Sequence, residues 1–440
     1  MVRKIVVKAP VDWYFNHGSN HIRKEKAMRN RYKAIALSVL GLVILPGSII
    51  LAEPQLKDVD ALVSANSTFA LDLYQKLCPS EGNLFFSPYS ISTALAMTYA
   101  GARENTEKEM ASALHFSMKQ ENLHPAFADL EDRLNKLQKA GNINLGVANS
   151  LWPQKDYKFL PEYLALIKKN YGVSITPVDY MQAAEATREM INKWVEDKTQ
   201  GKIKNLIPPG IFGKFTLLVL INAIYFKGDW ESQFRPDATK DSPFFISPEK
   251  SVQIPIMNQK ENFKYAQLES LQILELPYTG NELSMLVLLP KEKNGLQQLE
   301  SILTVENLKQ WKNQLGKEKV SVSLPKFKMT SSFSLNKTLK SMGMIDAFNV
   351  NDANFAGMDG RPASLLPLFI GAVFHNAFVD LNEEGTEAAA ATAVMMAGGG
   401  LPPPPKTFCA DHPFIFLIQD NQTGSILFMG RLTDPTYLNR

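Results

Sequence analysis

The sequence contains little cysteine and none of the common catalytic or metal-binding signatures. Its 440 residues include two cysteines, Cys78 and Cys409, and six histidines. Two cysteines permit at most one disulfide and exclude a cysteine-based metal cluster, and two separate buried thiols are the favoured interpretation. The HExxH, CxxC and GxSxG patterns are missing, which argues against a metalloprotease, a redox enzyme or a hydrolase. We therefore expect no enzyme activity, no metal site and no cofactor.

A strong charge of one sign is also missing once the N-terminal segment is set aside. The formal net charge is +3, with 47 lysines and arginines against 44 acidic residues. Nine of these basic residues and two of the acidic ones lie in residues 1–52, which leaves 38 basic and 42 acidic residues in the rest of the chain. A mildly acidic body gives no support to nucleic-acid binding. With 45% hydrophobic residues, the chain is able to bury a large core.

Residues 1–52 have the composition of an N-terminal extension that ends in a signal peptide. A cluster of basic residues precedes an uncharged run, residues 34–52, that contains a Pro-Gly step. This order predicts cleavage near the Ala52-Glu53 bond, secretion to an extracellular or periplasmic space, and no stable membrane association after cleavage. The nineteen-residue run is also long enough to anchor the chain in a bilayer. A true start at Met28 would give a leader of ordinary length.

Hydrophobic periodicity predicts helices mainly in the first half of the chain. Ser87-Pro88 is a typical helix start, and the helix after it is apolar on nearly every face, so we expect it to be central. An amphipathic helix over residues 184–201 should bury Met190, Ile191 and Trp194, the last as a packing residue rather than part of a ligand site. Other expected helices cover residues 59–77, 107–114, 159–171, 296–314 and 335–342, and the polar stretch up to residue 142.

β-Structure is predicted mainly in the second half. Residues 215–226 are a continuous apolar run rich in branched side chains, which indicates a strand buried on both faces. Residues 414–430 should form a hairpin, and the Asp411-His412-Pro motif before it is interpreted as a turn and not as a catalytic dyad. The remaining expected strands are residues 143–152, 244–246, 252–257, 263–266, 271–276, 283–289, 319–328 and 363–381. With no internal repeat or linker in this part, we expect one α+β domain over residues 53–440.

Eight motifs, in order along almost the whole chain after residue 59, resemble the serpin family. They are residues 83–102 with Ser-Pro-Tyr-Ser-Ile, 192–203, 222–230 with Asn-Ala-Ile-Tyr-Phe-Lys-Gly-Asp-Trp, 324–327, 353–358, 375–378 with His-Asn-Ala-Phe, 383–392, and 411–416 with Asp-His-Pro-Phe-Ile-Phe. The resemblance implies one domain with a large central, mostly antiparallel sheet, additional sheets, about eight or nine helices and an exposed reactive loop near residues 383–405. It also implies a monomer.

The resemblance further implies an irreversible, suicide-substrate inhibitor of secreted serine proteases. The protease serine forms an acyl ester with the reactive loop, and the cut loop enters the central sheet before water hydrolyses the ester. The expected partner is thus a target protease, held in a covalent acyl complex. Two alternatives stay open. The first alternative to this inhibitor is a non-inhibitory serpin that binds or carries another molecule, and the second is a cross-class inhibitor of papain-like cysteine proteases.

The hinge of the expected reactive loop is rich in small residues. Side chains of a strand alternate between its two faces, and in the family the face that contains the position of Thr386 becomes buried. Residues 386, 388, 390, 392 and 394 share that face, and all are uncharged and no larger than valine, whereas Glu387 falls on the other face. The hinge residues that match the family motif are Glu383, Glu384, Gly385, Thr386, Glu387, Ala388, Ala389, Ala390, Ala391 and Thr392.

The family's spacing from the first hinge acid places the reactive bond between Gly399 and Gly400. Glycine offers no side chain to a specificity pocket, which predicts a protease with a small pocket, elastase-like or subtilisin-like. Met395, Met396 and Ala397 are alternative positions for the cut.

Five more residues match positions at which the family's central sheet opens. Four of them, Ser87, Ser90, Asn222 and His375, match a polar cluster under the centre of the sheet. Trp230 matches the top of the sheet, where insertion begins. By residue type alone, a histidine among apolar residues is more often a hydrogen-bonded core residue than a catalytic one, and the resemblance gives His375 both a core and a switching role.

Overall fold

Two β-sheets and ten α-helices organise the residues that the structure, a computed structural model, describes: 52–141, 143–361, 368–385 and 404–436. This confirms the expected α+β class and exceeds the eight or nine helices anticipated. The helices are α2 (Ala52–Leu77), α3 (Pro88–Tyr99), α4 (Glu104–Ala113), α5 (Gln120–Lys139), α6 (Pro161–Tyr171), α7 (Tyr180–Lys198), α8 (Leu296–Ile302), α9 (Val305–Lys312), α10 (Asn336–Ser341) and α11 (Ala356–Asp359).

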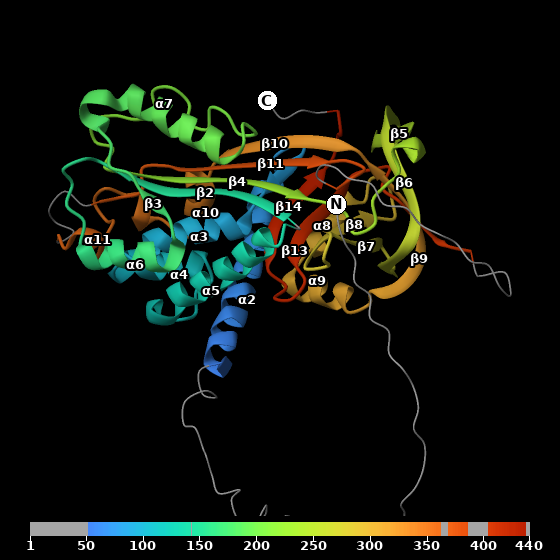
Figure 1. Cartoon of the computed structure of the whole chain (residues 1–440), viewed down its shortest axis with the longest axis horizontal. Coiled ribbons are helices and arrows are strands. Elements are labelled where there is room, and N and C mark those ends of the chain that lie inside the picture. Colours follow the sequence, from blue (N-terminus) through green and yellow to red (C-terminus); the bar gives the residue numbers. More distant parts are fainter. Residues whose placement is uncertain (1–51, 142, 362–367, 386–403, 437–440) are drawn as a thin grey trace, which may run out of the picture. The chain divides into compact units, whose positions relative to one another are not determined.

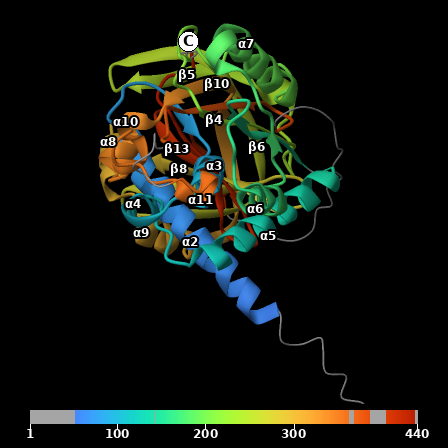
Figure 2. The same ribbon diagram turned by 90° about the vertical axis from the view of Figure 1, so that its left-hand side faces the viewer.

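The first sheet has five strands and mixed pairing. Its order is β10 (Phe327–Ser334), β11 (Val373–Leu381), β4 (Leu218–Gly228), β2 (Ile143–Pro153) and β3 (Ser174–Ile175). The central pair, β11 and β4, is parallel, whereas β10 and β2 lie antiparallel to their inner neighbours. Helix α7 lies over one face of this sheet, and α3, α5 and α6 lie on the other side (Figures 1 and 2). The expected burial of both faces of β4 follows from these two layers.

The second sheet has nine strands, and every pairing in it is antiparallel except that of β12 with β9. Its strands are β1 (Leu84–Phe86), β14 (Ile426–Leu432), β13 (Phe414–Asp420), β8 (Leu283–Pro290), β7 (Leu271–Pro277), β6 (Lys250–Gln267), β9 (Gly316–Pro325), β12 (Lys406–Cys409) and β5 (Lys240–Ser247). The expected hairpin of residues 414–430 is the β13–β14 pair. Much of the hydrophobic core is one cluster that includes residues of both sheets and of α2 and α3.

Helix α3 is central, as predicted, because every one of its residues is buried. Its start also follows the prediction. The Ser87 side chain accepts a hydrogen bond from the Ser90 backbone N–H, and Pro88 occupies the first turn, where a missing N–H costs nothing. The local sequence therefore fixes where this buried helix begins.

Several predicted boundaries are wrong. Residues 252–257 and 263–266 belong to one long strand, β6, and the single helix expected over residues 296–314 is the separate pair α8 and α9. Residues 319–328 are split at Lys326 between β9 and β10, which lie in different sheets. Strand β4 begins at Leu218, and Phe215 before it is 88% exposed. Met190 is also exposed, although its neighbour Ile191 is buried.

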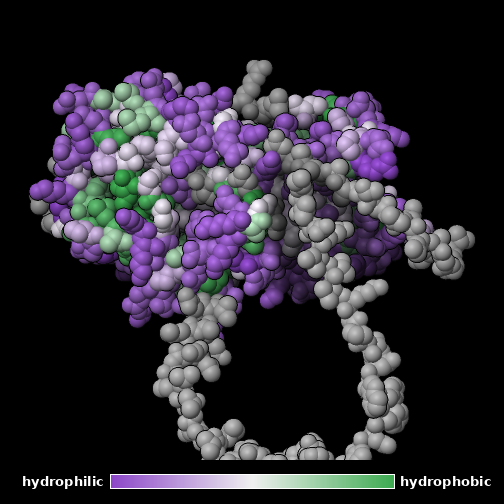
Figure 3. Space-filling model, in the orientation of Figure 1, coloured by the Kyte–Doolittle hydropathy of each residue, from purple (hydrophilic) through white to green (hydrophobic). Residues whose placement is uncertain are grey.

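The face in Figure 3 is mostly hydrophilic, with hydrophobic side chains gathered toward the left of the view. The large hydrophobic side chains that the described residues expose are Met181, Met190, Ile211, Phe215, Ile345 and Val350. Among the described residues, the helices are all too short or too polar to cross a lipid bilayer. Cys78 and Cys409 are free and partly buried, as the sequence favoured.

Candidate functional site

At the centre of the five-stranded sheet, β4 and β11 form a parallel pair over only part of their length. Strands β4 and β11 pair from Leu220 and Val373 up to Tyr225 and Phe378. Beyond that rung each strand continues to pair with its outer neighbour, β4 with β2 up to Gly228 and β11 with β10 up to Leu381. The inner edges of the two strands therefore separate at their C-terminal ends.

Toward the N-terminal ends of β4 and β11, a buried polar cluster connects both strands to helix α3. Asn222 of β4 and His375 of β11 are register partners, and the His375 Nδ1 contacts the Asn222 Oδ1. The Asn222 amide donates to the Ser90 carbonyl oxygen at 2.8 Å and to the Asn149 Oδ1 of β2 at 2.7 Å. Ser87 donates from its hydroxyl to the Leu427 carbonyl oxygen of β14 at 2.6 Å. The cluster thus ties three strands of one sheet to a helix and to the second sheet.

His375 is held as a neutral imidazole by its neighbours. The Ser87 backbone N–H donates to its Nε2 at 3.0 Å, so that nitrogen must accept, and Nδ1 carries the proton that is donated to Asn222. A charged imidazolium would place two donors against each other at Ser87. Its side chain is fully buried, and burial lowers the pKa of His375 from 6.5 to about 3.

This lowered pKa predicts that acid destabilises the fold. Between about pH 6 and pH 3 the unfolded chain binds a proton at this residue and the folded chain does not. The free energy of unfolding should therefore fall by about 1.4 kcal/mol per pH unit from His375 alone. Urea unfolding at pH 7.5, 6 and 5 measures this slope, and His375→Gln should reduce it by that amount.

A second buried histidine provides an internal comparison for this experiment. Burial lowers the pKa of His124 to about 4, and its Nδ1 lies 2.6 Å from the Tyr171 hydroxyl, which is not part of the polar cluster. His124→Gln should remove a similar slope over pH 6 to 4. If the His375→Gln variant kept the wild-type dependence of unfolding free energy on pH, His375 would not be the neutral histidine of the cluster.

The described part of the expected hinge is fixed where the two central strands separate. Residues 382–385 reverse the chain directly after β11, with Asn382 and Gly385 bridged to each other. The Glu384 carbonyl oxygen accepts from the Trp230 N–H at 2.9 Å, and the Glu383 carbonyl oxygen accepts from the Phe234 N–H at 2.8 Å. The segment that follows β4 therefore holds the start of the hinge.

The Glu383 side chain is anchored as well. Its carboxylate lies 2.8 Å from the Lys326 ammonium and accepts from the Thr239 hydroxyl at 2.8 Å. Although partial burial acts to raise it, these two donors hold the pKa of Glu383 below its ordinary value. The first hinge acid therefore joins three segments, the β9–β10 link, the residue before β5 and the end of β11.

Gly385 has no room for a side chain. A Cβ at this position would lie 2.4 Å from the Gly228 carbonyl oxygen and 2.5 Å from the Trp230 nitrogen, and φ is +124°. We expect Gly385→Ala to displace the hinge at a cost of about 1–3 kcal/mol. Urea unfolding measures the cost, and faster limited proteolysis after residue 385 reports the displacement.

Gly213→Ala is the matched control for Gly385→Ala. A Cβ at Gly213 meets no atom within 4 Å, and its backbone is outside the left-handed region. This variant should unfold like the wild type. Equal unfolding curves for the Gly385→Ala variant and the wild type would show that the hinge tolerates a side chain there.

The structure brings together four of the five sheet-opening residues predicted from sequence. Ser87, Ser90, Asn222 and His375 are in contact, whereas Trp230 lies beyond the end of β4, stacked on Tyr278 at 4.6 Å. The Trp230 indole N–H donates to the Asn382 carbonyl oxygen at 3.1 Å. The remaining hinge residues, Thr386 to Thr392, and the candidate cut positions, Met395, Met396, Ala397, Gly399 and Gly400, lie outside the described residues.

Sequence reasoning missed two groups of partners. Asn149 completes the polar cluster from β2, and Lys326 with Thr239 anchors Glu383. An asparagine within an apolar strand was a usable signal for the first. Nothing local indicates the second, because those residues are far from Glu383 in sequence.

Comparison with protein families agrees with this geometry. The family model of Serpin (serine protease inhibitor) matches residues 64–435. The chain belongs to the serpin family. Human leukocyte elastase inhibitor is 42% identical over 387 residues, which cover 86% of this chain and all of that protein. Human Serpin B3 is 43% identical over 397 residues, with the same two shares covered.

Solved serpin structures have the same fold. Uncleaved ovalbumin superposes with a TM-score of 0.76 at 34% identity, covering 85% of this chain and all of that one. Serpin48 from the insect Tenebrio molitor gives a TM-score of 0.74 at 33% identity, with 85% and 98% covered. The protein is thus a serpin protease inhibitor and not an enzyme. In the segment before β13, His412 contacts Asp411 and the Pro290 carbonyl oxygen.

Proposed function

We propose that this serpin is an irreversible, suicide-substrate inhibitor of serine proteases with a small specificity pocket, elastase-like or subtilisin-like. The observation that carries the proposal is the incomplete pairing of β4 with β11. The hinge is held at the end where this pairing stops. Because β4 and β11 are parallel and the turn at 382–385 reverses the chain, a strand that continues from Gly385 between them would run antiparallel to both. A strand that enters from this end has the right direction, and it would lengthen by separating the rungs that join β4 to β11.

The chemistry follows from acyl transfer. The protease serine Oγ attacks the carbonyl carbon of Gly399, the Gly399–Gly400 peptide bond breaks, and the Gly400 amine leaves with a proton. An ester then joins Gly399 to the enzyme, and water would normally hydrolyse it. Insertion of residues 386–399 must come first. About a dozen new ladder hydrogen bonds at about 1 kcal/mol each supply on the order of ten kcal/mol to hold the enzyme.

The preference for a small pocket rests on glycine at the cut and on the relatives. Human leukocyte elastase inhibitor carries the name of such a protease, and it is similar to this chain along its whole length. Cross-class inhibition of cysteine proteases and a carrier role remain the alternatives. The carrier role has a structural neighbour in human thyroxine-binding globulin, which superposes with a TM-score of 0.76 at 30% identity.

Incubation with a panel of proteases tests the proposal. An elastase should give a complex that survives SDS, and mass spectrometry of the released peptide should begin at Gly400. A new N-terminus after Met395, Met396 or Ala397 would move the reactive bond and keep the mechanism. Clean loop cleavage without any stable complex across serine and papain-like enzymes would instead indicate a carrier serpin.

We also propose that the chain is secreted after cleavage at Ala52-Glu53. The basic segment and the uncharged run before this bond support it, and helix α2 begins at Ala52, so the cut would remove one residue of that helix. N-terminal sequencing of protein from the culture medium should begin at Glu53. An intact Ala52-Glu53 bond would contradict the proposal.

A further inference from the structure

A pocket of about 210 Å³ lies at the outer edge of the five-stranded sheet, beside β2. Strand β3 pairs with Ser150 and Leu151 of β2, and the pocket lies at the start of this short strand. Its walls come from α3, α5, β2 and α7, and from the stretch that runs from the end of α6 to the start of β3. The side chains that decide its chemistry are Phe127, Glu131, Asn149, Tyr171, Trp194 and Lys198. We call it the edge pocket.

Glu131 is the carboxylate of the edge pocket, and it lacks a cationic partner. Its Oε2 accepts a hydrogen bond from the buried Tyr89 hydroxyl. No lysine, arginine or histidine of the described residues forms an ion pair with it, and the Asp132 carboxylate acts on it as a like charge. Burial raises the pKa of Glu131 above its ordinary value. A half-buried carboxylate of this kind gains most from a cation that enters its pocket.

Three aromatic side chains, Phe127, Tyr171 and Trp194, also line the edge pocket. Trp194 packs edge-on against Trp152, with 5.6 Å between ring centroids, and so has a fixed orientation. The Tyr171 hydroxyl is engaged by the His124 Nδ1 at 2.6 Å, and Tyr171 lines the pocket at the end of α6. Phe127 packs against Tyr171 at 5.7 Å. Ring faces near a carboxylate are the surroundings that favour an organic cation over a metal ion.

We propose that the edge pocket binds small organic ammonium ligands, in which one ring-sized apolar group carries a primary or quaternary ammonium. The ammonium would pair with Glu131, and the apolar group would lie between Phe127, Tyr171 and Trp194. The volume suits this size, because a dry cavity of about 150 Å³ is enough for benzene. This site plays no part in the protease reaction, and its test does not depend on inhibition.

Lys198 fixes the orientation of the ligand. It is exposed, lines the same pocket, and its ammonium lies 6.0 Å from the centroid of the Trp194 ring. The ligand cation is therefore repelled from the Trp194 side and drawn to Glu131. Removing the Lys198 charge should strengthen binding, whereas removing the Glu131 charge should weaken it, a pair of opposite effects that an apolar cavity alone would not produce.

Titration of the full chain with benzylammonium and with benzyl alcohol tests the proposal, using tryptophan fluorescence and calorimetry. The two ligands share the ring and differ in charge. Benzylammonium should bind saturably and about tenfold more tightly than benzyl alcohol, because a charge-assisted contact is worth more than a neutral one. Equal affinities, or no saturable binding of benzylammonium, would overturn the proposal without any need for a variant.

Three substitutions complete the test. Glu131→Gln keeps an acceptor for Tyr89 and should weaken benzylammonium about tenfold while leaving benzyl alcohol unchanged. Lys198→Met should tighten benzylammonium. Asp132→Asn removes the same charge from the exposed neighbour on the same helix, outside the pocket, and should have little effect. Equal weakening by Asp132→Asn and Glu131→Gln would indicate a general electrostatic effect and overturn the site.

Discussion

Thr386→Arg is expected to convert this serpin from an inhibitor into a substrate. Residue 386 is the first residue after Gly385 whose side chain belongs to the face that becomes buried on insertion, and the sequence places only small uncharged residues on that face. An arginine there would have to bury an unpaired charge between β4 and β11. With a penalty of several kcal/mol, insertion should slow by roughly a hundredfold or more, and hydrolysis of the acyl ester would come first.

The measurement is the ratio of serpin cleaved to serpin held in the SDS-stable complex with an elastase. Glu387→Arg is the matched control, since it introduces the same side chain one residue later, on the face that stays exposed. This control should still form the complex. Complex formation by the Thr386→Arg variant at the wild-type rate would refute insertion of this face.

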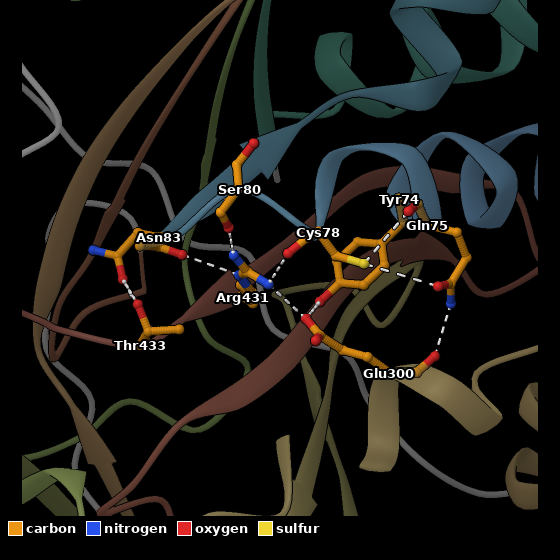
Figure 4. A network of polar contacts seen from close by, with 9 residues as sticks. Tyr74, Gln75, Cys78, Ser80, Asn83, Glu300, Arg431 and Thr433 are labelled. Atoms are coloured by element: carbon orange, nitrogen blue, oxygen red, sulfur yellow. Dashed lines mark hydrogen bonds and ion pairs between the residues drawn. The ribbon is translucent and has the colours of Figure 1, made fainter. Parts of the chain in front are cut away.

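Glu300→Ala is expected to be the most destabilising single substitution among those considered. Glu300 of α8 and Arg431 of β14 form a buried ion pair, with the Arg431 Nη1 2.7 Å from the Glu300 Oε1 (Figure 4). Both side chains are almost fully buried, and the Tyr74 hydroxyl donates to the same carboxylate oxygen at 2.8 Å. The network therefore fastens α2 and α8 to the C-terminal strand.

The remaining donors of Arg431 already have partners. Its guanidinium donates to the carbonyl oxygens of Cys78, Ser80 and Gly82, which form the link between α2 and β1 (Figure 4). Carbonyl oxygens satisfy hydrogen bonds but do not neutralise the charge. Loss of Glu300 would leave a buried cation uncompensated, at a cost of about 3–5 kcal/mol of unfolding free energy.

Urea unfolding of the wild type and the Glu300→Ala variant measures this cost. Asp197→Ala is the matched control, because the Lys193–Asp197 pair on α7 is exposed and should contribute less than about 0.5 kcal/mol. A similar small shift for both variants would mean that water reaches Arg431. The signal for this pair in the sequence was a lone arginine within the apolar run of β14.

Local patterns predicted the helices and strands whose formation depends on residues close together in the sequence. The Ser87-Pro88 start gave α3 its N-cap, the branched apolar run predicted β4, and residues 414–430 were predicted as the hairpin that β13 and β14 form. An error arose where a break in the pattern was passed over. Residues 319–328 were predicted as one strand, but their apolar alternation shifts by one residue at Pro325-Lys326, where the chain leaves one sheet for the other.

The sequence by itself determined the family, through eight motifs in order, and the small-residue face of the hinge, because alternation along a strand depends only on neighbouring residues. Only the tertiary structure decided that His375 meets Asn222 in a parallel register, that β4 and β11 separate above Tyr225, and that Gly385 fits against Gly228 without space for a Cβ. These contacts join residues more than 150 positions apart. Their geometry depends on how whole strands and helices pack, which no local pattern encodes.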